Sequence, residues 1–406
     1  MARILYAWEL GLDLGHIQRF LSFASCLSAC GHEVIFAAKD LSRIQSLPGA
    51  LVFETFQSPV WLPTIEGLPE PQVCYADILQ RVGYLDASGL LGMVKGWRSL
   101  FNRVKPQLLV VDHAPTALLA SRGLDFPRIT YGSGFYTPPC STPMPSMRPW
   151  LNLPANRIED SEAAVLRTIN QVLADLGGQP MQALSDLFTV DDNLLMTPAE
   201  LDHYPQRGPA HYMGPVLSVQ GGAMTEWPAG PGKKLFAYIK MSHPQSGQLF
   251  KQLSASPFNV LAYVPGLSEA RCRAMQAENL HISTQPLDMH YVMQQAQAVL
   301  CHGGIGTTLY GLLSGLPILF LPITLEQDLT ARNVVRLGVG ISIGFDETQS
   351  DFIAALRELV MNPAYTKMAH GFSRTYAGSQ EDEIMASVAR RCEELIADSV
   401  TENEAI

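Results

Sequence analysis

The stretch Ala298-Val-Leu-Cys-His302-Gly-Gly-Ile-Gly306-Thr-Thr308 joins the pattern of a buried strand to that of a helix. Its apolar run ends at His302, glycines follow at 303, 304 and 306, and a helical pattern begins at about Gly306 or Thr307. Such a turn gathers main-chain N–H groups at the positive end of a helix dipole, and glycines let an anion approach the backbone closely. The stretch therefore predicts an α/β fold with a phosphate site after this strand.

A glycine-rich turn between strand and helix also occurs in α/β proteins that bind no ligand there. In this chain His302, Thr307 and Thr308 add side-chain donors, and Gly315-x-Pro317 follows shortly afterwards. The combination favours a diphosphate site over a turn of purely structural role.

Short apolar runs with many β-branched residues recur through both halves of the chain, with helix-like segments between them. Nearly continuous apolar strands that alternate with helices indicate parallel sheets covered on both faces. The expected fold class is therefore α/β, with two parallel-sheet domains. We predict strands at 3–7, 33–37, 107–111, 128–131, 235–239, 259–263, 298–301 and 318–321.

The length of 406 residues exceeds what one hydrophobic core usually supports, so two domains are expected. A segment rich in Pro and Gly over 205–234 suits a connection between them. We predict an N-terminal domain over residues 1–215, an interdomain linker over 216–232, a C-terminal domain over 233–380, and a C-terminal helix and tail over 381–406.

Composition places the chain among globular proteins, because 47% of its residues are hydrophobic and 16% are charged. The net charge of -10 disfavours a nucleic-acid partner, which would require an excess of Lys and Arg. The first apolar run ends at Glu9, too early for a signal peptide or a transmembrane segment. The 7 cysteines lack paired spacing, which indicates reduced thiols and predicts a cytoplasmic location.

Two polar residues in the first half follow predicted strands. Gly15-His16 precedes an amphipathic helix pattern over 17–29, and Asp112 ends an apolar run. Strands of a doubly wound sheet end at one edge, where ligands bind, so His16 and Asp112 are expected to lie side by side there, where they could act as a base and its orienter. The alternative for each is a helix cap or a core hydrogen bond. His113 is expected to point away, because neighbours on a strand face opposite ways.

The order of these motifs resembles the UDP-glycosyltransferase superfamily, in particular its bacterial inverting enzymes. The resemblance implies two facing Rossmann-like domains, the GT-B arrangement, with the active site in the interdomain cleft. The chain contains no Asp-x-Asp of the kind that holds a metal-bound diphosphate, so metal-independent transfer is expected. No cofactor is expected beyond the nucleotide sugar, which is a co-substrate. The matching segments are His302-Gly-Gly-x-Gly-Thr, Gly315-x-Pro317, Pro322, Glu326-Gln327, Gly338-x-Gly340, Gly15-His16 and Asp112.

The resemblance assigns roles to four groups of residues. The catalytic pair is the base His16 and its partner Asp112. The ligands of the donor diphosphate are His302, Gly303, Gly304, Gly306, Thr307, Thr308, Lys240 and Ser242. The ligands of the donor sugar are Glu326 and Gln327. The loop at the nucleotide base contains Gln285, Pro286, Leu287 and His290. For Lys240 an exposed position at a strand end explains the sequence equally well.

Several positions depart from the family pattern. The loop Gln285–His290 lacks the family's usual Trp and Pro-Gln, and Lys240-Met-Ser242 stands where relatives often have Gly-Ser. Tyr310 stands where relatives carry a ribose-binding Glu, and Glu326 stands where they carry Asp. Arg19 replaces a Pro that commonly follows the catalytic His. Recognition of the nucleotide and the sugar therefore cannot simply be copied from the family.

The expected function is inverting transfer of a sugar from a UDP- or dTDP-sugar to a hydroxyl of a small apolar acceptor. Two alternatives stay open from the sequence: a nucleotide-sugar epimerase of the same fold, and a nucleotide-sugar-binding protein without catalysis. Aromatic side chains that could surround the acceptor, or equally belong to the core, are Trp8, Trp61, Phe135, Tyr136 and Trp150.

Overall fold

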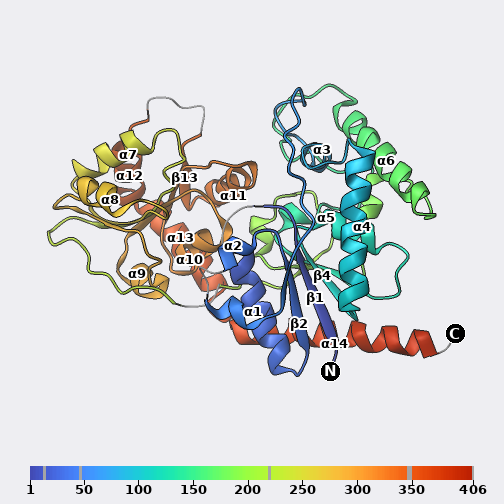
Figure 1. The fold of residues 1–406 in the computed structure, drawn as a ribbon. Coiled ribbons are helices and arrows are strands. Elements are labelled where there is room, and N and C mark those ends of the chain that lie inside the picture. Colours follow the sequence, from blue (N-terminus) through green and yellow to red (C-terminus); the bar gives the residue numbers. More distant parts are fainter. Residues whose placement is uncertain (12–14, 45–47, 218–220, 345–349, 405–406) are drawn as a thin grey trace. The chain divides into compact units, whose positions relative to one another are not determined.

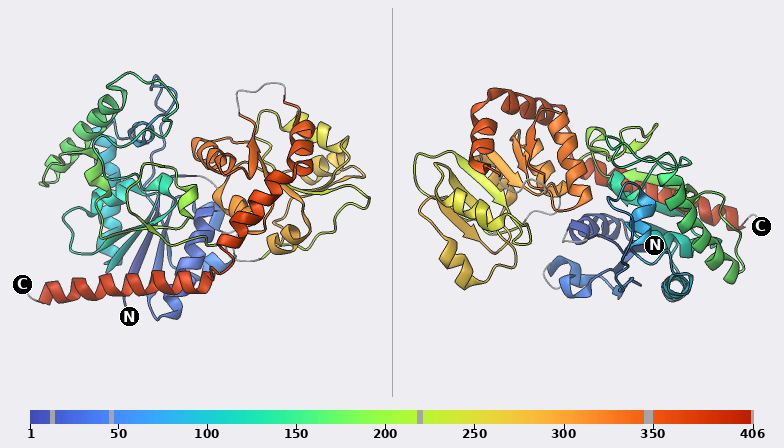
Figure 2. Two further views of the ribbon diagram at one scale, coloured as in Figure 1. Left: turned by 180° about the vertical axis from the view of Figure 1, so that it is seen from behind. Right: turned by 90° about the horizontal axis from the view of Figure 1, so that it is seen from above.

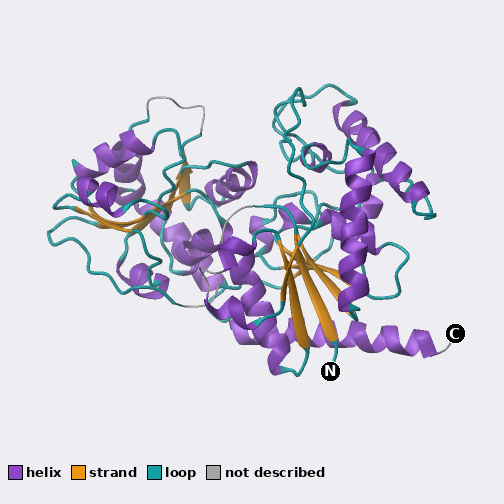
Figure 3. Ribbon diagram, viewed as in Figure 1, coloured by secondary structure: helices purple, strands orange, loops and turns teal. Residues whose placement is uncertain are grey.

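The computed structural model describes residues 1–11, 15–44, 48–217, 221–344 and 350–404. The chain divides into two compact units, each built around one parallel sheet flanked by helices (Figures 1 and 3). Unit 1 comprises Met1–Val216 together with Gln380–Ile406, and unit 2 comprises Leu217–Ser379. The predicted α/β class with two parallel-sheet domains is confirmed.

The sheet of unit 1 has seven strands, and all of its pairings are parallel. In sheet order the strands are β3 (Thr55–Gln57), β2 (Glu33–Ala38), β1 (Arg3–Trp8), β4 (Leu108–Asp112), β5 (Arg128–Gly132), β6 (Asp192–Leu195) and β7 (His211–Tyr212). Its α-helices are α1 (Gly15–Ala29), α2 (Leu41–Ile44), α3 (Tyr75–Gln80), α4 (Ala87–Val104), α5 (Pro115–Ser121), α6 (Arg157–Asp175) and α14 (Glu381–Glu404).

The sheet of unit 2 has six strands, again all parallel. In sheet order these are β10 (Leu280–Ser283), β9 (Asn259–Tyr263), β8 (Lys234–Tyr238), β11 (Ala298–Cys301), β12 (Ile318–Phe320) and β13 (Gly340–Ser342). The helices are α7 (Ser246–Ser254), α8 (Glu269–Met275), α9 (Met289–Gln295), α10 (Ile305–Leu313), α11 (Leu325–Arg336), α12 (Phe352–Met361) and α13 (Pro363–Thr375).

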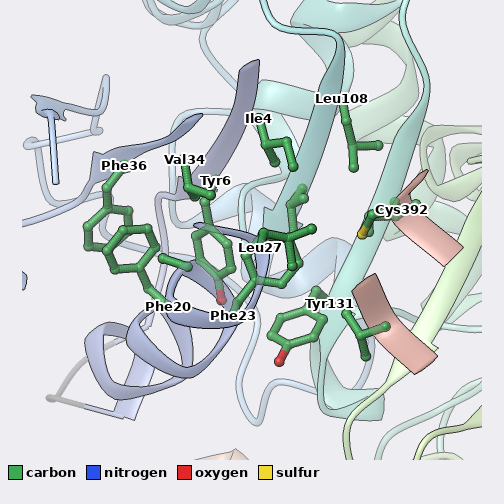
Figure 4. Packing of buried hydrophobic residues seen from close by; sticks show 14 of the residues in the cluster. Ile4, Tyr6, Phe20, Phe23, Leu27, Val34, Phe36, Leu108, Tyr131 and Cys392 are labelled. Atoms are coloured by element: carbon green, nitrogen blue, oxygen red, sulfur yellow. The ribbon is translucent and has the colours of Figure 1, made fainter. Parts of the chain in front are cut away.

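The core of unit 1 is rich in aromatic rings, as Figure 4 shows. Tyr6 of β1 makes edge or tilted contacts with Phe20 and Phe23 of α1, and the Phe20 ring stacks on Phe36 of β2 with centroids 4.0 Å apart. Alternate residues of a strand point to one face, so β1 and β2 present these rings together to the apolar side of α1. The packing therefore fixes α1, and with it His16, against the sheet.

The C-terminal helix α14 closes the same core. Met385, Val388 and Cys392 are buried in the cluster, and the helix runs past α1 in Figure 2. Arg391 Nε also donates to Asp192 Oδ2 at 2.6 Å, which ties α14 to the first residue of β6. The end of the chain is therefore part of unit 1, although it follows unit 2 in sequence.

Part of the predicted linker 216–232 is packed into unit 2. Ala223 exchanges main-chain hydrogen bonds with the segment around Leu287, through Pro286 O at 2.8 Å and Asp288 N–H at 3.1 Å. The Asn259 side chain donates to the carbonyls of Gly230 and Gly232.

Among the described helices, none combines the length and the hydropathy that a bilayer-spanning segment needs.

Candidate active site

Both predicted groups of polar residues lie at the switch points of their sheets. The strand order reverses between β1 and β4 in unit 1, and between β8 and β11 in unit 2. Ligands of open α/β sheets bind outside the carboxyl ends of the strands at such a point. His16 follows β1 and Asp112 ends β4, while Lys240 follows β8 and His302 follows β11. Each unit therefore has its own candidate site.

In unit 1 the structure brings His16 and Asp112 into direct contact. Asp112 pairs in register with Trp8, the last residue of β1, and His16 lies in the first turn of α1. His16 Nδ1 lies 3.0 Å from Asp112 Oδ2, and both side chains are buried. When Nδ1 donates its proton to a carboxylate, the neutral imidazole keeps Nε2 as a proton acceptor. This is the arrangement that a general base requires.

Asp112 has three hydrogen-bond donors. Tyr6 Oη and His16 share Oδ2, with Tyr6 at 2.9 Å, while Arg19 Nη1 donates to Oδ1 at 2.7 Å. Burial raises the pKa of Asp112, but the charge of Arg19 and the contacts of His16 and Tyr6 outweigh it, so the pKa lies below its ordinary value. Burial holds the pKa of Tyr6 well above its ordinary value, so this residue is a neutral donor. Asp112 is therefore an ionised, fully oriented carboxylate. The sequence did not indicate the contributions of Tyr6 and Arg19.

The environment of the His16 ring is aromatic on two sides. The Trp8 ring stacks on it with centroids 5.1 Å apart, and the Tyr136 ring lies at 5.3 Å. Gly11 comes close to the free nitrogen, because a Cβ added there would lie 2.4 Å from His16 Nε2. A side chain at this position would therefore collide with Nε2.

His113 does not point away from His16 as predicted. Its φ of +52° ends the regular strand geometry, so the alternation of strand neighbours stops at Asp112. The buried His113 ring stacks on Tyr136 at 4.4 Å and lies 6.5 Å from the His16 ring. Burial and the nearby His16 hold the pKa of His113 well below its ordinary value, so His113 is neutral.

The five candidate aromatic residues do not form one group. Phe135 and Tyr136 pack around His113, and Trp8 packs on His16. Trp61 instead lies over Gly83 and Gly89, where an added Cβ would come within 2.6 Å and 2.4 Å of its ring. Trp150 is 43% exposed.

In unit 2 the turn after β11 leads directly into α10. Gly304 is the N-cap, and the first N–H with an acceptor within the helix is that of Thr308, which bonds Gly304 O at 3.1 Å. The N–H groups of Ile305, Gly306 and Thr307 precede it and have no intrahelical acceptor. They form the positive end of the helix dipole, which suits a diphosphate.

The three glycines of this turn have different roles. Gly303 has a φ of +93°, and a Cβ there would lie 2.6 Å from the carbonyl oxygen of Gln327, so the fold itself requires glycine. A Cβ at Gly304 or Gly306 would meet no atom within 4 Å. These two glycines therefore leave open space at the end of α10.

The His302 side chain is engaged by the backbone. Its Nε2 accepts from the N–H of Lys240 at 2.8 Å, and its Nδ1 lies 2.6 Å from the carbonyl oxygen of Leu321. The ring therefore joins the ends of β8 and β12, a structural role beside the predicted contact with phosphate. The Thr308 hydroxyl likewise donates to Gly304 O at 2.9 Å, and the residue is buried.

Lys240 and Ser242 lie in the turn that follows β8, beside His302. Lys240 is half-buried and Ser242 is exposed. His243 was missed by sequence reasoning; it is buried and stacks on the His302 ring with centroids 5.8 Å apart. His243 and His302 thus bring the two turns into contact.

The predicted sugar ligands lie in the first turn of α11. Gln327 Oε1 accepts from the N–H of Ile323 at 2.9 Å and of Thr324 at 3.3 Å, so its side chain forms a capping box with Thr324. Glu326 is half-buried at the same helix end. The side-chain oxygen of Gln327 is thus already used by the fold.

The predicted base loop is held by its main chain. Leu287 is buried and pairs with Ala223, whereas Gln285 and Pro286 are exposed. His290 is exposed in the first turn of α9, with Nε2 2.8 Å from Gln294 Nε2.

Among the described residues, no group of three or more His, Cys, Asp and Glu side chains could hold a metal ion.

Because the His302 side chain makes two hydrogen bonds to the backbone, we expect its replacement to destabilise the fold strongly. His302→Phe keeps a ring in place but removes both hydrogen bonds to the backbone, and each such loss costs about 1–3 kcal/mol. We expect the free energy of unfolding in urea to fall by roughly 2–5 kcal/mol. His281→Phe, at an exposed position of β10, is the matched control and should change it little. An unchanged value for His302→Phe would contradict the structural role.

Comparison with known proteins agrees with this architecture. A family described as "Erythromycin biosynthesis protein CIII-like, C-terminal domain" matches residues 272–395. The chain is 25% identical to "PGL/p-HBAD biosynthesis glycosyltransferase" of Mycobacterium tuberculosis over 407 aligned residues, which cover 93% of this chain and 90% of the relative. The glycosyltransferase of kitacinnamycin superposes with a TM-score of 0.71 at 20% identity, covering 97% of this chain and 99% of the other.

A further solved structure, the spinosyn rhamnosyltransferase SpnG complexed with thymidine diphosphate, superposes with a TM-score of 0.67 at 19% identity. It covers 97% of this chain and 100% of the other. The fold of two Rossmann-like units is thus that of GT-B glycosyltransferases. Together with the related glycosyltransferase sequences, which align over 93% of this chain, it shows that the chain is a glycosyltransferase similar to those of the UDP-glycosyltransferase superfamily.

Proposed function

We propose that the protein moves a sugar, with inversion, from a nucleoside diphosphate sugar to a hydroxyl of a small apolar acceptor, and that His16 is the general base. The observation that carries this proposal is the bond between His16 Nδ1 and the buried, ionised Asp112. It leaves Nε2 as the acceptor of a proton, in surroundings made apolar by Trp8 and Tyr136.

In the proposed reaction, Nε2 of His16 takes the proton of the acceptor hydroxyl as its oxygen attacks the anomeric carbon. The new C–O bond forms as the bond from that carbon to the diphosphate oxygen breaks. Asp112 stabilises the imidazolium that results. The departing nucleoside diphosphate takes the electron pair and is stabilised by the N–H groups that begin α10.

We further propose that the donor is a dTDP-sugar, with a 6-deoxyhexose such as rhamnose as the first choice. SpnG, which this chain resembles in fold, is a rhamnosyltransferase whose structure holds thymidine diphosphate. A related protein of Mycobacterium bovis, 23% identical over 93% of this chain, is described as a rhamnosyltransferase. Tyr310, in place of a ribose-binding Glu, is consistent with a change in how the nucleotide is held.

Thermal shift with a panel of UDP- and dTDP-sugars tests this proposal. A ligand at a hundred times its Kd adds about 2.7 kcal/mol of stability, which is readily detected. We expect dTDP-rhamnose to stabilise the protein more than UDP-glucose. Incubation with labelled donor alone also tests the epimerase alternative, because interconversion of sugars without an acceptor would support that alternative.

Transfer is expected to be independent of metal ions. The leaving diphosphate meets main-chain donors at a helix N-terminus, which can stabilise its charge without a cation. Initial rates with dTDP-rhamnose should therefore be the same in EDTA and in Mg²⁺. A loss of activity in EDTA that Mg²⁺ restores would contradict this prediction.

A further inference from the structure

Arg19 is a charged partner of Asp112 that the proposed mechanism does not use. Its Nη1 donates to Oδ1 at 2.7 Å, and its side chain is only 13% exposed. His16 and Tyr6 occupy the other oxygen, Oδ2. One carboxylate therefore lies between an imidazole and a guanidinium that is charged at every relevant pH.

The position of Arg19 is fixed by its neighbours. Its guanidinium carbon lies 5.6 Å from the centroid of the Tyr136 ring, within range of a cation–π contact. Gly132 ends β5 beside it, and a Cβ there would lie 2.9 Å from Tyr136 Cδ2 and 3.4 Å from Asp112 Oδ1. Glycine at 132 thus leaves the room that Asp112, Arg19 and Tyr136 occupy. The ion pair is part of a packed arrangement and is unlike a surface salt bridge.

The charges of this arrangement act on the base. A carboxylate alone would strongly favour the protonated form of the imidazole that it contacts. A guanidinium on the same carboxylate offsets part of its negative charge and repels the imidazolium. We propose that Arg19 is a positioning residue that weakens the hold of Asp112 on protonated His16, and so keeps His16 available as a base at more acid pH. This inference rests on the proposed function.

Other titratable groups lie around His16, and their titration must be distinguished from that of His16 in the test. Tyr6, Tyr131 and Tyr136 are phenols, and burial raises the pKa of the first two. His113 is neutral, as described above. Lys39 Nζ donates to Gly11 O at 2.7 Å. Glu9, whose carboxylate accepts from the Thr116 N–H at 2.9 Å, is the important competitor, because burial raises its pKa to about 7.

The test compares Arg19→Gln, which keeps a donor and loses the charge, with Arg19→Lys, which keeps the charge. kcat/KM is measured against pH with dTDP-rhamnose as donor and 2-phenylethanol, an alcohol that does not titrate, as acceptor probe. We expect the acid limb to move up by about one pH unit in Arg19→Gln, and to stay near that of the parent in Arg19→Lys. On that limb Arg19→Gln then loses about tenfold in activity, whereas at alkaline pH the profiles converge. The same shift is expected in a Glu9→Gln background.

A drop in activity that is uniform across pH in both variants would overturn the inference, since it would show a purely structural role. A second readout does not depend on turnover: the titration midpoint of the His16 signal in spectra of protein labelled with ¹³C at histidine Cε1, assigned by its loss in His16→Gln. This midpoint should move up in Arg19→Gln. An unmoved midpoint overturns the role of Arg19, whereas a moved midpoint with an unmoved activity limb overturns the role of His16 as the base.

Discussion

Replacing His16 by Ala is expected to lower kcat/KM for 2-phenylethanol by about 10²–10⁴, the usual contribution of general-base catalysis. The reason is that, in the proposed mechanism, Nε2 is the proton acceptor that the bond to Asp112 leaves available. Binding of dTDP should not change, because the residues proposed to hold it lie in unit 2. Initial rates with dTDP-rhamnose, together with calorimetric titration of dTDP, check both expectations.

An acceptor that is already ionised separates a missing base from a damaged fold. With 4-nitrophenol in mildly alkaline buffer no proton has to be removed, so the defect of His16→Ala should shrink strongly. His113→Asn is the matched control: it removes a second buried histidine, 6.5 Å away, and Asn tolerates the positive φ at that position. Turnover of 2-phenylethanol that survives His16→Ala within a few-fold would show that His16 is not the base.

Asp112→Asn addresses the other member of the pair. The amide can no longer stabilise the imidazolium, and its NH₂ can favour the wrong tautomer of His16. It also removes the carboxylate that pairs with Arg19. Asp112→Asn therefore changes the surroundings of both His16 and Arg19, whereas His16→Ala removes the imidazole alone.

The pairing of His16 with Asp112 could be predicted because it follows from topology. Both residues end or follow apolar runs with clear strand patterns, and chain order in a doubly wound sheet places those two strand ends together. The same reasoning brought Lys240 and His302 to one edge in unit 2. All eight predicted strands are present, with ends that differ by at most one residue. The missed strands β3, β6, β7, β10 and β13 have two to four residues and lie toward the sheet edges, where the apolar pattern is weak.

What could not be predicted depends on contacts between side chains distant in sequence. Nothing in the spacing indicates that Arg19 reaches Asp112, or that the imidazole of His302 bonds the main chain at Lys240 and Leu321. The direction of the His113 side chain depends on the left-handed backbone conformation of His113 itself, with its φ of +52°. Gln327 is a second example. The family motif suggests a sugar ligand, but in the structure the Gln327 side chain forms part of the N-terminal cap of α11.

The proposed diphosphate site in unit 2 is best tested at Gly304, where ligand binding and stability are expected to change in opposite directions. Gly304 is the N-cap of α10, its φ of −63° and ψ of 134° are open to any residue, and a Cβ there meets nothing within 4 Å. Asp is among the best N-cap residues, and a negative charge at a helix N-terminus is favourable. Gly304→Asp should therefore fold as well as the parent, or be slightly more stable.

The same carboxylate would occupy the place proposed for the diphosphate. It would compete for the N–H groups that begin α10 and repel the ligand's charge, which at a distance of about 4 Å costs several kcal/mol near a protein surface. We expect the Kd for dTDP in calorimetric titration to rise by roughly 10²-fold or more. Gly304→Asn has the same shape without the charge and caps the helix equally well, so its Kd should rise far less. If Gly304→Asp bound dTDP as tightly as the parent, the diphosphate would have to lie elsewhere, because a fixed negative charge at the helix end cannot be neutral toward a second one beside it.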